Sequence, residues 1–542
     1  MMKRRIAIVS ACLVLAGMIV GLFLLFSNYV ILNGKFVNCE AEHIELTGNE
    51  MPSMKKLHRL EKMQSVNLGG ILCSVEEYEA FCAEFPDCDI RWQVPFHGEY
   101  FDSMITVLPT VNFDESDIDM LRYFPELETV DARGCSNFDV LLKLEDARPD
   151  LSVIYEIELA GGQRLRENAT ECTVTGENAQ QLLEMIPYLP ELHTIYSENC
   201  KEYDVLMDIL REYPEIDLQY SVEIGRSAYS GDATDLTLDI SDAVGALEML
   251  QYFPELQNVT FIGLATDSDL MYQIMCAYPN AVIVWEFELY GVRTSSTATE
   301  LFLNQIQMDS VELVENSLKY FYDLQWVEMC RCGIPSEEMD ALWKRHPETR
   351  FVWEIPMGLW YIRTDAKGFI SFKYGYDIDL PLRDAELREF KYLVDMECLD
   401  LGHMRMTDIS FLQYMPKLRF LILADTICTD FSYLANLTEL VYLELFRSEF
   451  RDVNLLMGLT KLEDLNIGWT ELDNPEKLME MTWLKRLWAT KNGMDPAKYY
   501  LLEKALPDTY VYMKSSHPTE GGWRKSDRYY EMRDMLGMFY LD

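Results

Sequence analysis

The sequence has few basic residues, few glycines and few prolines. Its 47 Lys and Arg stand against 90 Asp and Glu, which gives a net charge of −43. So large an acidic excess repels phosphate backbones and anionic lipid head groups, and nucleic acid is therefore not an expected partner. With 27 Gly and 20 Pro in 542 residues the chain is not collagen-like, and 49% hydrophobic residues exclude an acidic disordered tail.

Motifs of the common catalytic sites are also missing from the sequence. No two of the seven histidines lie four residues apart, and no H-E-x-x-H, G-x-S-x-G, P-loop or G-x-G-x-x-G pattern occurs. The acidic residues 114–119 and the pair Asp377 and Asp379 lack the Gly and terminal Glu of an EF-hand loop, so we interpret them as a helix start or a solvated loop. The sequence therefore predicts a protein that is not an enzyme and uses no metal or other cofactor. An enzyme whose acid and base are scattered through irregular segments is the alternative.

Thirteen cysteines are spread along the chain without a paired framework, so few or no disulfides are expected. Cys330 and Cys332 form the one close pair. Without a second pair or a histidine at ligand spacing, this pair is a weak indication of zinc.

The one long hydrophobic run lies at the N-terminus. Residues 6–32 contain no charged side chain, and residues 6–26 would span about 31 Å as a helix, enough to cross a bilayer. Lys3, Arg4 and Arg5 precede the run, which predicts a cytoplasmic stub at 1–5, a transmembrane signal anchor at 6–32 and an extracytoplasmic remainder. A cleaved signal peptide is the alternative, but no Ala-x-Ala cleavage site follows. The expected location is the cell membrane, with a single pass.

The C-terminal part of the chain is repetitive. The pattern L-x-x-L-x-L recurs every 22 residues and begins at Met396, Leu418, Leu440, Leu462 and Leu484. This spacing resembles the leucine-rich repeats of bacterial internalin-like and SDS22-like proteins. The resemblance implies an α/β leucine-rich-repeat solenoid, with parallel strands on the concave face and helices or irregular turns on the convex face.

The same strand pattern recurs upstream in steps of about 65 residues, close to three 22-residue turns. It begins at Met63, Leu127, Leu192, Leu256 and Leu324. Each step then has a helical stretch, a Pro, a β-rich run and a Gly where a tight turn or hairpin is expected, at Gly98, Gly161, Gly225, Gly291 and Gly358. We interpret residues 33–395 as a diverged repeat solenoid and residues 396–513 as regular repeats with a terminal unit.

The last residues, 514–542, are expected to cap the solenoid. Apolar and aromatic residues lie there at helical spacing, at Tyr529, Tyr530, Met532, Met535 and Leu536. An open solenoid end exposes apolar surface that must be covered, which predicts a C-terminal cap. A tail that docks a partner is the alternative.

The repeat register also explains several cysteines. Cys135, Cys200 and Cys332 each occupy the ninth position of their repeat, where the leucine-rich-repeat pattern places a buried Asn or Cys that bonds to backbone. We therefore interpret these three as structural residues, with Cys330 as a neighbour in the strand.

Residues between the core leucines of each strand point outward and line up in columns on the concave sheet. Several of these outward residues are aromatic where a solvated face should be polar, and exposed Trp and Tyr are typical of binding hot spots. The candidate partner-binding residues are Phe420, Ile422, Tyr442, Glu444, Phe446, Trp469 and Trp488. The alternative is that the C-terminal cap folds over them.

These features together predict a membrane-anchored, non-catalytic surface protein that binds a protein or other macromolecule through the concave face of its repeats. A structural spacer of the cell envelope is the alternative that leaves the sheet without a ligand.

Overall fold

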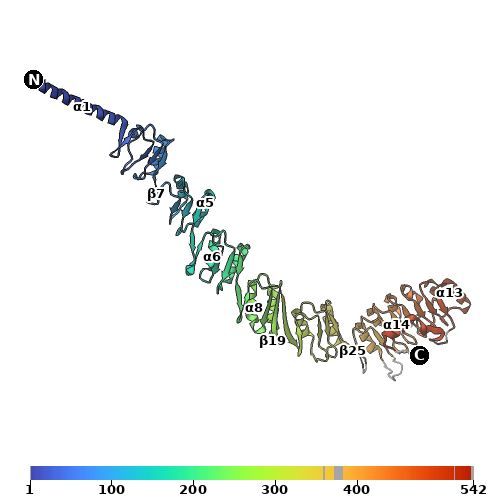
Figure 1. The fold of residues 1–542 in the computed structure, drawn as a ribbon. Coiled ribbons are helices and arrows are strands. Elements are labelled where there is room, and N and C mark those ends of the chain that lie inside the picture. The colour runs from blue at the N-terminus through green and yellow to red at the C-terminus, as the bar shows by residue number, and fades with distance from the viewer. Residues whose placement is uncertain (1, 358–359, 372–381, 515, 518, 539–542) are drawn as a thin grey trace. The chain divides into compact units, whose positions relative to one another are not determined.

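The computed structural model describes residues 2–357, 360–371, 382–514, 516–517 and 519–538, and the side chains at 2–9, 22–26 and 360 lie outside that description. Figure 1 draws the helices and strands of the chain in sequence order. The chain divides into two compact units. The first comprises Met1–Ala233 with Met249–Glu255, and the second comprises Thr234–Glu248 with Leu256–Asp542.

The chain begins with helix α1 (Met2–Asn28), which ends earlier than the predicted anchor. Tyr29–Leu32 form strand β1, which pairs antiparallel with β2 (Lys35–Asn38) across a tight turn. The turn is possible because Asn33 and Gly34 both adopt positive φ, the conformation of a two-residue hairpin. The predicted boundary at residue 32 is therefore wrong. Within the described part of the chain, no helix combines the length and the apolar character needed to cross a membrane.

The rest of the first unit repeats one motif three times: three short parallel strands followed by an antiparallel hairpin. The parallel sheets are β3 (His43–Glu45), β4 (Ser65–Asn67), β5 (Asp89–Arg91); β8 (Val107–Pro109), β9 (Thr129–Asp131), β10 (Ser152–Ile154); and β13 (Glu171–Val174), β14 (Thr194–Ser197), β15 (Asp217–Gln219). The hairpins are β6 (Gln93–Phe96) with β7 (Glu99–Asp102), β11 (Glu156–Glu158) with β12 (Arg164–Arg166), and β16 (Ser221–Ile224) with β17 (Ser227–Ser230).

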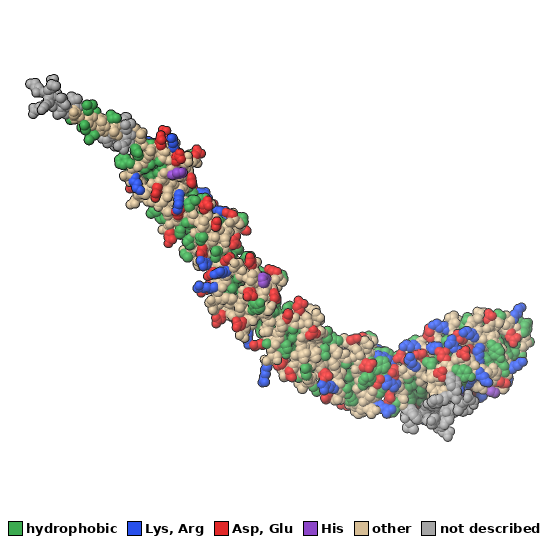
Figure 2. Space-filling model, in the orientation of Figure 1, with side chains coloured by type: hydrophobic (Ala, Val, Ile, Leu, Met, Phe, Trp, Pro, Cys, Tyr) green, Lys and Arg blue, Asp and Glu red, His purple; other side chains and the backbone are tan. Residues whose placement is uncertain are grey.

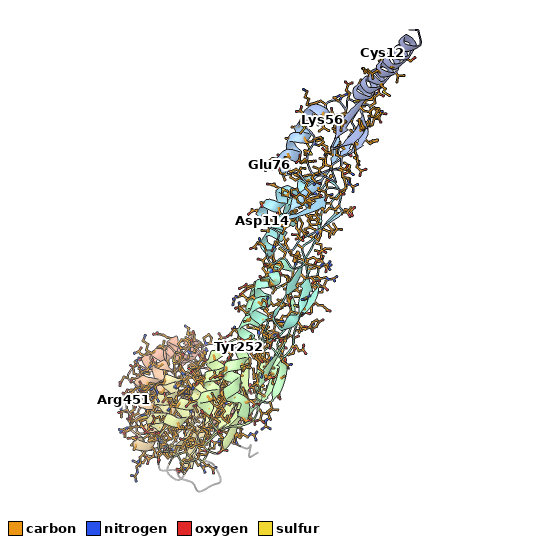
Figure 3. All side chains as sticks on the ribbon, turned by 90° about the vertical axis from the view of Figure 1, so that its left-hand side faces the viewer. Cys12, Lys56, Glu76, Asp114, Tyr252 and Arg451 are labelled. Carbon is orange, nitrogen blue, oxygen red and sulfur yellow. The ribbon has the colours of Figure 1, made fainter. Side chains whose placement is uncertain are left out.

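Helices connect the parallel strands of each motif. They are α2 (Met54–Leu57), α3 (Val75–Glu84), α4 (Glu115–Met120), η1 (Leu121–Tyr123), α5 (Phe138–Ala147), α6 (Ala179–Met185), η3 (Ile186–Tyr188) and α7 (Tyr203–Glu212), while the short turn η2 (Ala160–Gly162) closes a hairpin. Asp114, labelled in Figure 3, caps α4 by accepting a hydrogen bond from the Ser116 N–H at 2.8 Å. The acidic residues 114–119 are thus a helix start, as predicted. Asp377 and Asp379 lie outside the described residues.

The second unit begins with two more copies of this motif. The parallel strands of the first copy are β18 (Asp235–Asp239), β19 (Asn258–Ala265) and β20 (Val282–Leu289), and β20 also forms the hairpin with β21 (Val292–Ser295). The parallel strands of the second copy are β22 (Glu300–Phe302), β23 (Trp326–Glu328) and β24 (Arg350–Val352), and its hairpin is β25 (Glu354–Met357) with β26 (Trp360–Arg363). The connecting helices of the second unit are η4 (Ile240–Asp242), α8 (Ala243–Met249), α9 (Ser268–Ala277), α10 (Glu312–Ser317), η6 (Leu318–Tyr320) and α11 (Ser336–Arg345). The short helix η5 (Leu250–Tyr252), which follows α8 in the chain, is assigned to the first unit.

A buried aromatic residue marks the point where the third strand enters its hairpin. The Trp92 N–H donates to Ser103 Oγ at 3.2 Å, and the Ser103 N–H donates back to the Trp92 carbonyl at 2.9 Å. The same exchange, eleven residues apart, joins Trp285 to Ser296 and Trp353 to Thr364. Gly98, Gly161, Gly225 and Gly291 all have positive φ in the hairpin turns, which confirms the predicted turns. Gly358 lies outside the described residues.

The second unit continues as a seven-stranded parallel sheet with one strand per repeat. Its strands are β27 (Gly368–Ile370), β28 (Cys398–Asp400), β29 (Phe420–Ile422), β30 (Tyr442–Glu444), β31 (Asp464–Asn466), β32 (Arg486–Trp488) and β33 (Tyr510–Tyr512). Short helices form the opposite layer: α12 (Asp384–Leu387), η7 (Arg388–Tyr392), η8 (Ser410–Tyr414), η9 (Ser432–Asn436), η10 (Val453–Leu456), η11 (Pro475–Glu480), η12 (Pro496–Lys498) and α13 (Tyr499–Ala505).

The core between this sheet and the short helices follows the predicted register. One column of leucines pairs strand by strand and is fully buried: Leu399, Leu421, Leu443, Leu465 and Leu487. At the ninth position the Thr426 and Ser448 hydroxyls donate to the carbonyls of Leu423 and Leu445, directly after strands β29 and β30, at 2.8 and 2.7 Å. Cys332 is buried at the equivalent position and its thiol lies 3.1 Å from the Leu303 carbonyl. These contacts agree with the structural interpretation of the cysteines.

Candidate functional site

The seven predicted binding residues lie together on one face of the seven-stranded sheet, the face opposite the leucine core. We call this the sheet face. Strand alternation places Phe420 and Ile422 on β29, Tyr442 and Glu444 on β30, and Trp488 on β32, while Phe446 and Trp469 follow directly after β30 and β31. The structure therefore brings these seven residues together.

The predicted exposure of these residues is wrong. Six of the seven are at most 2% exposed, and only Trp469 is half-buried. They are covered by residues 519–538, which we call the strap and which include η13 (Glu520–Lys525) and α14 (Asp527–Met535). Trp523, Tyr529 and Met532 of the strap pack into one buried cluster with Phe420, Tyr442 and Trp488. The structure thus follows the alternative in which the C-terminal segment covers the patch.

The strap crosses the sheet in the reverse order of the repeats. At β32, the Trp488 indole N–H donates to the Glu520 carbonyl and Arg486 donates to the Trp523 carbonyl, both at 2.9 Å. Five strands away, a Cβ added to Gly368 of β27 would lie 3.0 Å from the Met535 carbonyl. The strap also contacts the last strand, where a Cβ added to Gly521 would lie 2.6 Å from the Tyr512 ring. The core side of that strand stays open, since Val511 is half-buried although it pairs with the fully buried Leu487. The segment predicted as an end cap therefore covers the sheet face.

A buried carboxylate lies at the centre of this contact. Glu444 is fully buried and accepts hydrogen bonds from the Trp523 indole N–H at 2.7 Å and the Tyr442 hydroxyl at 3.1 Å. Arg524 Nη2 lies 3.3 Å from the same carboxylate. Burial, followed by the Glu444 charge, raises the pKa of Tyr442 well above its ordinary value. Burial alone would lower the pKa of Arg524, but Glu444 together with Tyr442, Tyr529 and Asp400 outweighs burial and raises this pKa, so Arg524 stays charged.

Ion pairs also join the strap to the repeats at the margins of the sheet face. Glu463 accepts hydrogen bonds from Arg528 at 2.8 Å and from Lys485 at 2.7 Å, and these cations lower the pKa of Glu463 to about 2 against the opposing effect of burial. Arg419 Nη2 lies 2.5 Å from Glu531. These contacts fix the position of the strap, because each carboxylate has a cation facing it across the contact.

One column beside the strap stays accessible, and we call it the rim column. Its members follow strands β28 to β32 and all adopt left-handed backbone conformations with φ between 53° and 64°: His403, Asp425, Arg447, Trp469 and Lys491. Asp425 lies 3.1 Å from His403 Nδ1 and 3.3 Å from Arg447 Nε, and the Lys491 ammonium lies 3.8 Å from the Trp469 ring centre. Figure 2 shows basic and acidic side chains interspersed over these C-terminal repeats.

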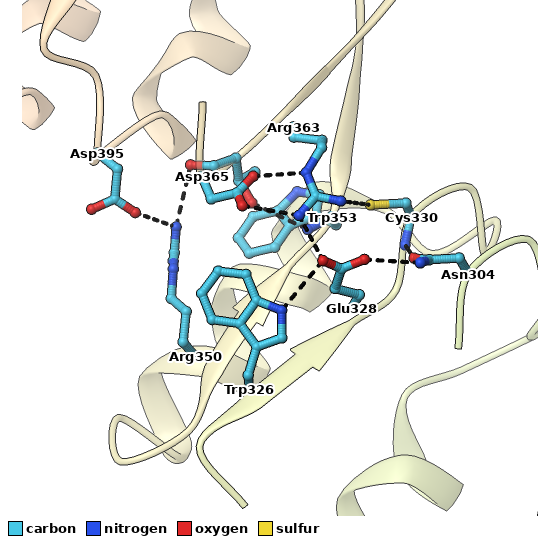
Figure 4. A network of polar contacts seen from close by, with 10 residues as sticks. Asn304, Trp326, Glu328, Cys330, Arg350, Trp353, Arg363, Asp365 and Asp395 are labelled. Carbon is cyan, nitrogen blue, oxygen red and sulfur yellow. Dashed lines mark hydrogen bonds and ion pairs between the residues drawn. The ribbon is translucent and has the colours of Figure 1, made fainter. Parts of the chain in front are cut away.

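A second polar cluster lies on strands β22 to β26 and is drawn in Figure 4. Glu328 accepts hydrogen bonds from Arg363 at 2.7 Å and from Asn304 at 2.9 Å, and Arg363 also pairs with Asp365 at 2.9 Å. Arg363, followed by Asn304, lowers the pKa of Glu328 to about 2 against the effect of burial. Because Glu328, Arg363 and Asn304 satisfy one another, the cluster joins the hairpin to the sheet.

At the cysteine pair next to this cluster, no third ligand from the residues that the structure describes completes a metal site. Burial raises the pKa of the Cys330 thiol to about 12, so the thiolate that a metal needs is disfavoured. Among the described residues no group of three or more His, Cys, Asp or Glu side chains could hold a metal ion. All thirteen cysteines are free thiols.

The 22-residue register, the single column of buried leucines and the paired parallel strands are the geometry of a leucine-rich-repeat protein. No protein-family model matches the sequence, and no curated protein matches it. Solved structures that match this chain include internalin C2 of Listeria monocytogenes, with 18% identity, cover of 29% of this chain and 76% of that chain, and a TM-score of 0.21. A second internalin of that organism, inlF, matches with 13% identity, cover of 66% of this chain and 85% of that chain, and a TM-score of 0.23. A leucine-rich-repeat protein of Leptospira interrogans also matches, with 13% identity, cover of 86% of this chain and 95% of that chain, and a TM-score of 0.22. At these TM-scores the similarities carry no argument about function.

Proposed function

We propose that this chain is a non-catalytic leucine-rich-repeat protein that binds a protein partner, and that the rim column is the part of the concave side that makes the contact. The observation that carries the proposal is the row of five left-handed residues with large side chains, His403 to Lys491, beside the strap. Trp469 belongs both to this column and to the residues selected from the sequence.

The left-handed backbone of the rim column has a structural reason, and its side chains contact one another and, through Trp469, the Phe446 ring. In this conformation the Asp425 N–H donates to the Phe446 carbonyl at 2.8 Å and the Trp469 N–H donates to the Thr490 carbonyl at 2.7 Å, which extends the ladder beyond the strands. Gly or Asn would adopt it at the least cost, whereas other residues cost on the order of 1 kcal/mol or more each. Retaining Arg447 and Trp469 at such positions is explained if these side chains contact a partner, since Trp and Arg are enriched in binding hot spots.

Two further parts of the proposal rest on the sequence. Lys3, Arg4 and Arg5 before the charge-free residues 6–32 support a membrane anchor with the repeats outside the cytoplasm. The net charge of −43 favours a protein partner over nucleic acid. Protease added to intact cells would digest the repeats of the full chain if this orientation is right, and their protection beside a digested surface marker would contradict it.

Partner capture with the tagged full chain tests the binding proposal. We expect a protein captured by the wild-type chain to be lost with the double substitution Arg447→Ala and Trp469→Ala, because both removed side chains belong to the contact. The matched control removes two exposed lysines on the opposite helical layer, Lys477→Ala and Lys498→Ala. Equal capture by all three chains would refute the rim column as the contact. No capture by any chain would favour the spacer alternative.

A further inference from the structure

The strap resembles a bound peptide more than a layer of the core. Of its twenty residues only three are buried, Trp523, Tyr529 and Met532. The leucine core behind the sheet is closed by the short helices of the opposite layer and does not include the strap. Removing the strap would therefore uncover the sheet face without opening the core.

The surface beneath the strap has the chemistry of a selective site. Its floor is aromatic, with Phe420, Tyr442 and Trp488, and the Glu444 carboxylate points out of it. Glu463 and Asp464 add two further carboxylates, Asp464 lying 2.9 Å from Arg486. A carboxylate on an aromatic floor favours a ligand that supplies both a cation and an indole or amide N–H, which is what Trp523 and Arg524 supply.

We propose that the sheet face is a binding site for a partner peptide that carries a Trp-Arg pair followed by a second Arg four residues later, and that the strap occupies this site as an intramolecular ligand. The strap supplies these groups as Trp523, Arg524 and Arg528. A partner segment of the same chemistry displaces the strap and takes over the contacts to Glu444 and Glu463. The inference rests on the contacts of the strap and not on the rim column, whose Trp469 packs against the edge of the same cluster.

Because the strap occupies the sheet face, it lowers the affinity of that face for an added peptide. A ligand that competes with a docked segment can bind only the chains in which that segment is undocked. Its apparent dissociation constant is therefore the intrinsic constant divided by the undocked fraction. Weakening the strap therefore strengthens binding of an added peptide, while removing Glu444 weakens the strap and the added peptide alike. The affinity for the added peptide should thus rise when the strap is weakened and fall when Glu444 is removed. This pair of opposite changes is expected if the strap is an exchangeable ligand and not if it is a fixed structural layer.

The test uses a fluorescent synthetic peptide of residues 519–538 and the full chain. We expect the Arg528→Ala chain, which loses the strap contact to Glu463, to bind the peptide at least about tenfold more tightly than the wild-type chain. Trp523→Ala in the chain is a second variant with the same expected direction. Adding Glu444→Gln to either variant should weaken peptide binding at least about tenfold, because the substitution removes the charge that Arg524 faces.

Two controls make the result specific. A peptide of the same composition in scrambled order should not bind, and circular dichroism should show that each variant keeps its repeats folded. Absence of peptide binding to both folded variants would overturn the proposal, as would binding that ignores Glu444→Gln. A concentration-dependent dimer formed by exchange of straps, without binding of free peptide, would assign the site to a second copy of the chain and would also overturn it.

Discussion

The substitution Trp523→Ala probes how the strap is held. The Trp523 side chain is fully buried, its ring centre lies 4.9 Å from that of Tyr442 and 5.1 Å from that of Trp488, and its indole N–H donates to Glu444 at 2.7 Å. Truncation to Ala leaves a cavity between the two rings and removes one hydrogen bond from a buried carboxylate. Both changes affect the docked strap and leave the leucine core intact.

The magnitude follows from these contacts. Large aromatic residues truncated in a packed core cost about 3–5 kcal/mol. A hydrogen bond to a charged group adds about 1.5–3 kcal/mol, although the two terms overlap because they describe one side chain. We therefore expect the free energy of strap docking to fall by about 3–5 kcal/mol, which is a factor of about 100 to 1,000 or more in the docking equilibrium.

Hydrogen exchange measures this loss residue by residue. The Leu536 N–H, which donates to the Met532 carbonyl at 3.0 Å within the strap, should exchange at least about 100-fold faster. The Leu445 N–H, bonded to the Asn466 carbonyl at 2.7 Å between strands, should change far less. Trp343→Ala on α11, away from the strap, is the matched control. Unchanged protection of the strap, or equal loss at both amides, would refute the reasoning.

Three further predictions concern pH, the core and a hairpin. The folded pKa of Glu463 is lowered from 4.5 to about 2, so the contribution of Glu463 to strap docking is complete above pH 4.5 and is lost as the pH falls towards 2. Hydrogen exchange of the strap amides, followed as a function of pH, measures this loss. The substitution Arg528→Ala should flatten the pH profile. Leu443→Ala should cost about 2–5 kcal/mol and raise hydrogen exchange in the neighbouring strands β29 and β31, with no change in β3–β5 of the first unit; uniform deprotection of the whole chain would contradict this. Gly231→Ala should lower the thermal unfolding midpoint, because its Cβ would lie 2.1 Å from the Tyr220 ring, whereas Gly176→Ala, with no atom within 4 Å, should not; equal midpoints would show that the ring can move aside.

The repeats could be predicted from the sequence because their pattern is local. Each copy of L-x-x-L-x-L determines one strand, and the 22-residue spacing determines which residues pair, for example Leu443 with Leu465. The hairpin glycines were found for the same reason, since a positive φ favours Gly whatever the surroundings. The Ser and Thr residues that close three of the hairpins were missed, because Ser103, Ser296 and Thr364 are recognised only when their positions are compared eleven residues after the aromatic residue.

The position of the strap could not be predicted from a local pattern. Trp523 contacts Glu444 from 79 residues away and Met532 contacts Cys398 from 134 residues away, and no repeat period links these residues. Helical spacing did predict a helix in this segment, and α14 (Asp527–Met535) confirms it. One signal was present: the strap carries Arg524 and Arg528, and the opposite charge lies at Glu444 on β30 and at Glu463 just before β31. Complementary charge between an end segment and an exposed column is the feature that indicates such docking.

The strap also changes how stability is shared among the repeats. In a simple solenoid each repeat contacts only its neighbours, so a defect in one strand weakens the next. Here one segment is hydrogen-bonded to Trp488 on β32, to Glu444 on β30 and, through Glu531, to Arg419 beside β29. Undocking of the strap therefore releases contacts on several strands at once. Strands that do not touch each other are coupled through it, and displacement of the strap by a ligand would lower the stability of all these repeats together.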